Sequence, residues 1–201
     1  MVTVTECTTL GKGRLRFHLD NGTELVLYRG EAKQFRMREG STLSDEEEHQ
    51  LIYEVVGKRA KRRTMHLLEQ MDRTEQQLRD KLKQGGYPQA CIDLAIEYVK
   101  SFHYVDDYRY ACTYINYRQD RMSRYQLKVK LYGKGVPGEL IDRALEECYE
   151  GDEQEQIIRL LEKKKFDAQN SDPKEFTRVY QYLMRRGFRS SDVLCAMKSK
   201  Q

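Results

Sequence analysis

Three stretches of the chain decide its fold: residues 82–96 read LKQGGYPQACIDLAI, residues 131–145 read LYGKGVPGELIDRAL, and residues 183–197 read LMRRGFRSSDVLCAM. Each stretch has a leucine four residues before a glycine, an apolar residue directly after it, and an alanine nine residues after it. The aligned glycines are Gly86, Gly135 and Gly187, which lie 49 and 52 residues apart. A pattern shared at several positions in three copies indicates an internal repeat of one structural unit.

The residues after each glycine predict a helix. Positions six, nine and ten after the glycine fall on one helical face, and the alanine at the second of them lets a neighbouring helix approach closely. The glycine itself predicts the end of the preceding helix, because it takes a left-handed conformation without a Cβ clash. Pro88 and Pro137 stand where the first helical position tolerates a missing N–H.

Two further helices are expected in each unit. The helix before each glycine begins at a capping sequence, which is Thr74 with Gln77, Ser123 with Gln126, and Asp172-Pro173 with Glu175. A preceding helix is expected over residues 58–70, 107–119 and 153–166. A three-helix unit of about 50 residues argues against the shorter two-helix tetratricopeptide repeat.

The first 57 residues have a different pattern, which predicts β structure. Arg14 to Asp20 alternates apolar and polar residues, Thr23 to Tyr28 supplies a second strand, and Asn21-Gly22 favours a tight hairpin turn between them. Val2 and Val4 are candidates for a third strand. The segment from Glu31 to Met37 is expected to help cover the apolar face of this sheet. A capping box then starts a helix whose buried face carries four apolar residues; the box is Ser44 with Glu47, and the buried residues are Leu51, Ile52, Val55 and Val56.

We therefore predict a mainly α protein with three tandem three-helix repeats in an elongated array, preceded by a small N-terminal β-hairpin or sheet segment. The expected divisions are residues 1–57, 58–106, 107–152 and 153–201. Composition agrees, because 39% hydrophobic residues, 34% charged residues and a mean hydropathy of −0.83 suit thin helical layers better than one thick core.

The cysteines and the chain start indicate the compartment. Five cysteines are scattered with no C-x-x-C pair, and we predict buried reduced thiols in place of disulfide or zinc partners; they are Cys7, Cys91, Cys112, Cys148 and Cys195. The chain contains no run of 18 apolar residues and no secretory signal at its start. We expect a cytoplasmic protein without a membrane span.

Catalytic motifs are not found. The four histidines lack metal-ligand spacing and a paired nucleophile. Asp106-Asp107 is interpreted as a helix start, where carboxylates cap N–H groups. Gly11-Lys12-Gly13 and Gly133-Lys134-Gly135 lack the frame of a phosphate-binding loop, and are interpreted as a strand turn and a helix end. The sequence predicts no enzyme, no cofactor and no metal site.

Positive charge is concentrated in two places, residues 58–63, which hold five cations in six residues, and residues 108–135. The net charge of +4 divides into −3 over residues 1–57 and +7 over the remainder, and residues 108–135 hold seven basic groups against Asp120 alone. Such a field favours a polyanion or an acidic protein surface, whereas the alternative is a solvated helix face. The candidate partner- or DNA-binding residues are Lys61, Arg62, Arg63, Arg118, Arg121, Arg124, Lys128, Lys130 and Lys134.

Tyrosines are interleaved with these cations, and they have two interpretations. Stacking on nucleic-acid bases is the first. Packing in the core is the second, and it is favoured for most of them because Tyr110, Tyr114 and Tyr117 have helical spacing beside Ala111 and Ile115.

The middle unit contains Tyr104-Val105-Asp106-Asp107, Tyr110-Ala111, Tyr114 and Arg118, followed by Leu131 and Gly135-Val136. Through these residues it resembles the RecX family, which comprises bacterial regulators of the recombinase RecA. The first unit is similar through Lys61-Arg62-Arg63, Leu67-Leu68, Leu78, Leu82 and Gly86-Tyr87, and the third is the weakest match. Family members often have glycine where this chain has His103, and Gly133 is an additional glycine.

The resemblance implies a curved array that lodges in the groove of a RecA filament on single-stranded DNA and dampens ATP hydrolysis and strand exchange in DNA repair and the SOS response. It implies a RecA partner, with single-stranded DNA as a possible direct contact, and a monomeric protein. Two alternatives stay open: a helix–turn–helix transcriptional regulator that reads duplex DNA, and a neutral helical scaffold.

Overall fold

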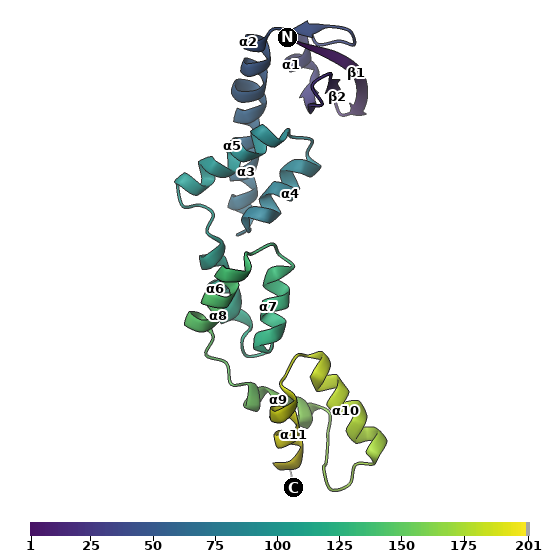
Figure 1. Ribbon diagram of the computed structural model, residues 1–201, viewed down its shortest axis with the longest axis vertical. Coiled ribbons are helices and arrows are strands. Elements are labelled where there is room, and N and C mark those ends of the chain that lie inside the picture. Colours follow the sequence, from purple (N-terminus) through teal and green to yellow (C-terminus); the bar gives the residue numbers. More distant parts are fainter. Residues whose placement is uncertain (200–201) are drawn as a thin grey trace. The chain divides into compact units, whose positions relative to one another are not determined.

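A computed structural model describes residues 1–199, and the chain divides into two compact units, Met1–Asp106 and Asp107–Gln201. The first unit contains an N-terminal sheet and a three-helix domain, and the second contains two more three-helix domains (Figure 1). The prediction of a mainly helical chain with three three-helix domains and a small N-terminal sheet is confirmed.

The N-terminal sheet has four antiparallel strands in the order β3-β2-β1-β4. These strands are β1 (Val2–Gly11), β2 (Arg14–Leu19), β3 (Glu24–Tyr28) and β4 (Thr42–Leu43). The expected hairpin joins β2 to β3 with Gly22 at φ +82°, and the glycines of Gly11-Lys12-Gly13 have positive φ in the turn between β1 and β2. The third strand expected from Val2 and Val4 is β1. It is 10 residues long and lies between β2 and β4 in the sheet.

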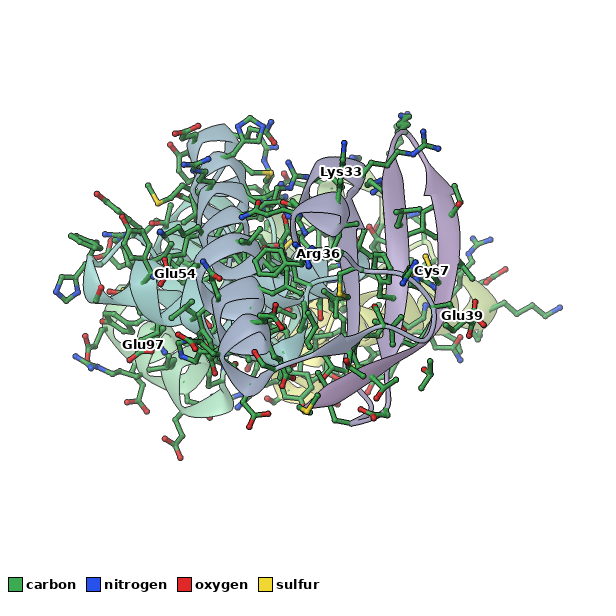
Figure 2. All side chains as sticks on the ribbon, turned by 90° about the horizontal axis from the view of Figure 1, so that it is seen from above. Cys7, Lys33, Arg36, Glu39, Glu54 and Glu97 are labelled. Atoms are coloured by element: carbon green, nitrogen blue, oxygen red, sulfur yellow. A yellow bond between two sulfur atoms is a disulfide. The ribbon has the colours of Figure 1, made fainter. Side chains whose placement is uncertain are left out.

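A helical segment continues from the sheet into the first domain. Ser44 caps α2 (Asp45–His49) as predicted: its hydroxyl accepts the N–H of Glu47, and the Glu47 carboxylate accepts the N–H of Ser44. The segment runs on through the π-helix η1 (Gln50–Gly57) into α3 (Lys58–Gln70) without an extended residue at either junction. Figure 2 shows the chain from above. In this view, Lys33 on α1 (Arg29–Gln34) lies between the strands and the helix that carries Glu54. Ala32 and Met37 are buried in the same core, so this segment covers the sheet as expected.

Each three-helix domain contains the helices that the repeat predicts. The first consists of α3, α4 (Glu75–Gln84) and α5 (Gln89–Ser101). The second consists of α6 (Asp107–Arg118), α7 (Arg124–Tyr132) and α8 (Gly138–Cys148). The third consists of α9 (Glu153–Lys163), α10 (Pro173–Arg185) and α11 (Ser190–Ser199). The side chains of Thr74, Ser123 and Asp172 accept the N–H three residues later, so the predicted caps are present.

The aligned glycines end the middle helix of each domain. Gly86, Gly135 and Gly187 have φ of +76°, +81° and +78°. The leucines four residues before them and the alanines nine residues after them are buried, at no more than 3% exposure. Both prolines stand one position earlier than predicted, because Pro88 and Pro137 have extended backbones at the N-cap.

The cysteine prediction is wrong for one pair. Cys112 of α6 and Cys148 at the end of α8 form a disulfide, with Cα atoms 5.6 Å apart. Thirty-six residues separate them, and no local spacing shows that two helices of one domain bring them together. Of the others, Cys91 is buried as expected, Cys7 is half-buried and Cys195 is exposed.

Gly86 and Arg59 connect the sheet to the first domain. The guanidinium of Arg59 donates to the Glu31 carboxylate and to the carbonyl of Val26, and it lies over the rings of Tyr28 and Tyr87 at 5.0 and 5.5 Å. A Cβ at Gly86 would lie 2.5 Å from Cγ2 of Val26. The turn of the first domain therefore packs directly against β3.

Replacing Gly86 with alanine tests this close approach. Gly40→Ala is a matched control, because Gly40 has φ +78° but its Cβ would meet nothing within 4 Å. We expect Gly40→Ala to lower the free energy of unfolding by about 1 kcal/mol from backbone strain. Gly86→Ala should lower it by about 2–4 kcal/mol, because overpacking against Val26 adds to that strain.

Urea unfolding of both variants measures the difference. In a Val26→Ala background the excess cost of Gly86→Ala should disappear, since the clashing methyl groups are gone. Equal losses for Gly86→Ala and Gly40→Ala in the native background would contradict the packing contact.

Candidate partner-binding surface

The basic run at the start of α3 is partly used within the fold. Lys58 pairs with Glu54 at 2.6 Å, and Arg59 joins the sheet to the first domain. The ammonium of Lys61 lies 5.2 Å from the centre of the Tyr98 ring. Arg62 and Arg63 are exposed. Of the three residues predicted here as contacts, these two arginines are therefore the ones that face solvent.

The second domain gathers the other six candidates around α7. Arg118 ends α6, Arg121 lies in the α6–α7 loop, and Lys134 follows α7. The remaining candidates, Arg124, Lys128 and Lys130, are on α7 itself. The end of α6, the α6–α7 loop, α7 and the residues directly after α7 thus carry all six side chains within a single domain.

The helix α7 has a buried face and an opposite, exposed face. Leu127 and Leu131 are fully buried in the domain core. Tyr125, Val129 and Tyr132 have i, i+4, i+7 spacing and lie on the far side, exposed by 60%, 50% and 72%. We call these three residues the α7 stripe. Large apolar side chains gathered on a solvent-facing helix surface are typical of an interaction site.

Cations lie along both sides of the α7 stripe. On the side of α8, Lys128 pairs with Asp142, and Arg124 lies 5.9 Å from the centre of the Tyr149 ring. On the side of α6, Lys134 lies 5.3 Å from the centre of the Tyr114 ring, which Arg118 approaches at 5.2 Å. Within residues 1–199, Arg121 and Lys130 form no ion pair, so no carboxylate of the described chain neutralises their charges.

The tyrosines divide between the two interpretations. Tyr108, Tyr110 and Tyr114 pack against the core of the second domain, as predicted for most of them. Tyr117 is exposed by 84% and remains available for stacking. Tyr125 is exposed by 60%, but part of its ring packs against Gly187. Val129 and Tyr132 were not predicted as surface contacts, although their spacing opposite Leu127 and Leu131 was a sufficient signal.

The α7 stripe is particular to the second domain. Counting from the aligned glycines, the same outward positions are Gln76, Asp80 and Lys83 on α4, and Thr177, Gln181 and Met184 on α10. All six residues are exposed. The repeated fold therefore does not require large apolar residues at these positions. Tyr125 packs against Gly187 of the third domain, and a further reason is needed for Val129 and Tyr132.

A cavity of about 810 Å³ lies in the first unit between the β2–β3 turn and the α4–α5 turn. Its acidic side chains already have partners: Asp45 binds the N-terminal ammonium, Glu48 accepts from Asn21, and Glu24 pairs with Arg16. The acidic side chains of the cavity are therefore used in contacts within the fold.

Residues 1–199 contain no group of three or more histidine, cysteine or acidic side chains that could hold a metal ion. No helix in the same residues is long and apolar enough to cross a bilayer.

The fold and this surface define a helical-repeat protein with an exposed aromatic and basic face. Family models for the first, second and third three-helix domains of RecX match residues 60–98, 106–145 and 151–197. A regulatory protein RecX from Caldanaerobacter subterraneus subsp. tengcongensis is 30% identical over 158 residues, which cover 78% of each chain. One from Geobacillus kaustophilus is 33% identical over 159 residues, which cover 77% of this chain and 59% of that protein.

A solved structure has the same fold. The crystal structure of a regulatory protein RecX superposes with a TM-score of 0.64 at 21% identity, and covers 96% of this chain and 97% of that one. The chain belongs to the RecX family of regulatory proteins. The family is not enzymatic, which confirms that part of the sequence prediction.

Alanine substitutions on α7 should separate its two faces. Tyr132→Ala removes a side chain that is 72% exposed, so we expect a change of less than about 0.5 kcal/mol in the free energy of unfolding. Leu131→Ala empties a fully buried site and should cost about 2–5 kcal/mol. Chemical denaturation followed by circular dichroism measures both, and a large loss for Tyr132→Ala would mean that the stripe serves folding.

Proposed function

We propose that this protein binds the RecA filament on single-stranded DNA and inhibits RecA recombinase and ATPase activity in DNA repair and the SOS response. One observation carries the proposal: the chain belongs to the RecX family, and its second domain adds an exposed surface of cations and tyrosines. It would act in the cytoplasm as a monomer, without a cofactor.

The chemistry of the second domain supports a negatively charged partner. Arg121 and Lys130 project charge beside the α7 stripe, where aromatic area and positive charge meet. Phosphates of a DNA strand, or carboxylates of a RecA subunit, match such a surface. Tyrosines beside the cations add contact area that costs little conformational entropy on binding, because a tyrosine has few rotatable bonds.

Titration against RecA tests the proposed function. Adding this protein to RecA on single-stranded DNA with ATP should slow hydrolysis at ratios from sub-stoichiometric to equimolar. The physical reason is that a protein lodged on the filament blocks its cycle or promotes its disassembly. Steady-state phosphate release measures the effect, and no change at micromolar protein would refute the proposal.

Charge reversal tests which domain makes the contact. The variant Arg118→Glu, Arg121→Glu, Lys130→Glu should bind the filament at least about tenfold more weakly, because attraction becomes repulsion. Its affinity should also depend less steeply on salt, since fewer phosphate counterions are released. Filament-binding titrations at several salt concentrations measure both, with circular dichroism to check that helicity is unchanged.

The matched control changes the same charge elsewhere. Lys33→Glu, Arg38→Glu, Lys81→Glu replaces three exposed cations of the first unit. If both triple variants lose affinity equally, a general charge effect explains the loss. If the second-domain variant binds normally, the second domain is not the contact site and the neutral-scaffold interpretation applies to it.

A further inference from the structure

The disulfide of the second domain lies where α8 ends and the connection to the third domain begins. Cys148 is the last residue of α8, and Cys112 is on the facing helix α6. Both residues are half-buried at the margin of the second domain's core. A disulfide that is not fully enclosed is open to exchange with other thiols.

Two hydrogen bonds flank the disulfide and hold the same segment, Glu147–Glu150, against α6. The hydroxyl of Tyr108 donates to the Glu147 carboxylate. At the other end of α6, the side-chain oxygen of Gln119 accepts the N–H of Glu150 at 2.7 Å. The disulfide thus adds a covalent link to these hydrogen bonds between α6 and the end of α8.

This segment also sets the start of the third domain. The side-chain amide of Gln156 in α9 donates to the carbonyl of Gln119 at 2.6 Å and contacts the Tyr149 hydroxyl at 3.4 Å. Arg124, the first residue of α7, lies over the ring of Tyr149 and donates its backbone N–H to Glu153 at 2.7 Å. Any change at Cys148 therefore acts on both the basic helix α7 and the third domain.

The three-helix fold does not need sulfur at this place. Val99 stands thirteen residues after Gly86, as Cys148 stands thirteen after Gly135, and Val99 is fully buried. A valine thus fills the equivalent position in the first domain. The two cysteines of the second domain need an explanation other than packing.

Two other thiols of the chain compete poorly for oxidation. Burial raises the pKa of Cys91 to about 11, and its thiol donates to the carbonyl of Ile52. Burial also raises the pKa of Cys7, and the Glu39 carboxylate beside it adds to the shift (Figure 2). Because the thiolate is the reactive form, both pKa shifts lower the reactivity of these thiols near neutral pH.

We propose that Cys112 and Cys148 are a reversible thiol–disulfide site, which low-molecular-weight disulfides oxidise and thiols reduce, and which fastens the end of α8 to α6. In oxidation, one cysteine thiolate attacks the small disulfide, forms a mixed disulfide and releases one small thiol. The second cysteine thiolate then attacks the protein sulfur and releases the other. Two electrons pass to the oxidant, and the two cysteine protons end on the two released thiols.

Oxidation stabilises the second domain because it joins residues 36 apart in sequence. A cross-link of that span raises the folding equilibrium constant by about 30-fold or more. Reduction removes the covalent link and leaves the non-covalent contacts of the segment from Glu147 to Gln156, so this segment opens more often. The surface around α7 is then held less firmly in the reduced protein than in the oxidised one.

The first experiment maps the bond. The full chain with Cys195→Ser, which removes the exposed cysteine, is reduced with dithiothreitol and then titrated with oxidised glutathione. Non-reducing peptide mapping should show a Cys112–Cys148 peptide and a loss of two titratable thiols, both reversed by dithiothreitol. Glutathione adducts at Cys112 or Cys148 without a joined peptide, or no reaction, would overturn the proposal.

The second experiment compares the oxidised and reduced forms of the same chain by hydrogen exchange. The N–H groups of Glu150 and Gln156 should exchange at least about tenfold faster after reduction, whereas those of α5 in the first unit should not change. Cys112→Ser in the Cys195→Ser background serves as the control that cannot close, and it should match the reduced protein in either buffer. Equal exchange in the two forms would overturn the proposed fastening, whether or not RecA is inhibited.

Discussion

The structure depends on one constraint, which is the left-handed glycine that ends the middle helix of each domain. A residue with a side chain is strained at φ near +80°, so glycine lets the chain reverse direction directly after the helix. The N–H of Tyr87 then bonds the carbonyl of Leu82, and that of Val136 bonds the carbonyl of Leu131. These bonds satisfy helix carbonyls and bring the apolar residue after the glycine onto the core leucine.

The missing Cβ also leaves space for a neighbour. Val26 of the sheet occupies it at Gly86, and Tyr125 of the second domain occupies it at Gly187, where a Cβ would lie 2.2 Å from the ring. The Ser123 hydroxyl strengthens the second contact by donating to the carbonyl of Arg186 at 2.6 Å. At Gly86 and Gly187, one backbone requirement therefore shapes the turn and also provides a place where an earlier element of the chain packs.

Local patterns made most of the fold predictable, whereas features that depend on contacts between residues far apart in the sequence could not be predicted. Caps, turn glycines and helical spacing act within a few residues, and the predicted hairpin and helices are present for that reason. The disulfide joins residues 36 apart, and the central place of β1 depends on pairing with both β2 and β4. His103, which stands where the family often has glycine, takes φ +54°, so a local turn requirement persists there without the usual residue.

The candidate surface was predictable in charge but not in shape. Counting cations located the second domain, yet the count did not show that Arg59 is used inside the first unit or that Lys128 pairs with Asp142. Three domains build the same interior from leucine, isoleucine and alanine, whereas only α7 carries exposed aromatics at the outward positions. The exposed area of Val129 and Tyr132 contributes little to folding, since it stays in water, whereas Tyr125 also packs against Gly187. The core that the three domains share already accounts for the fold of the second domain, so Val129 and Tyr132 are the residues that the proposed partner contact would explain.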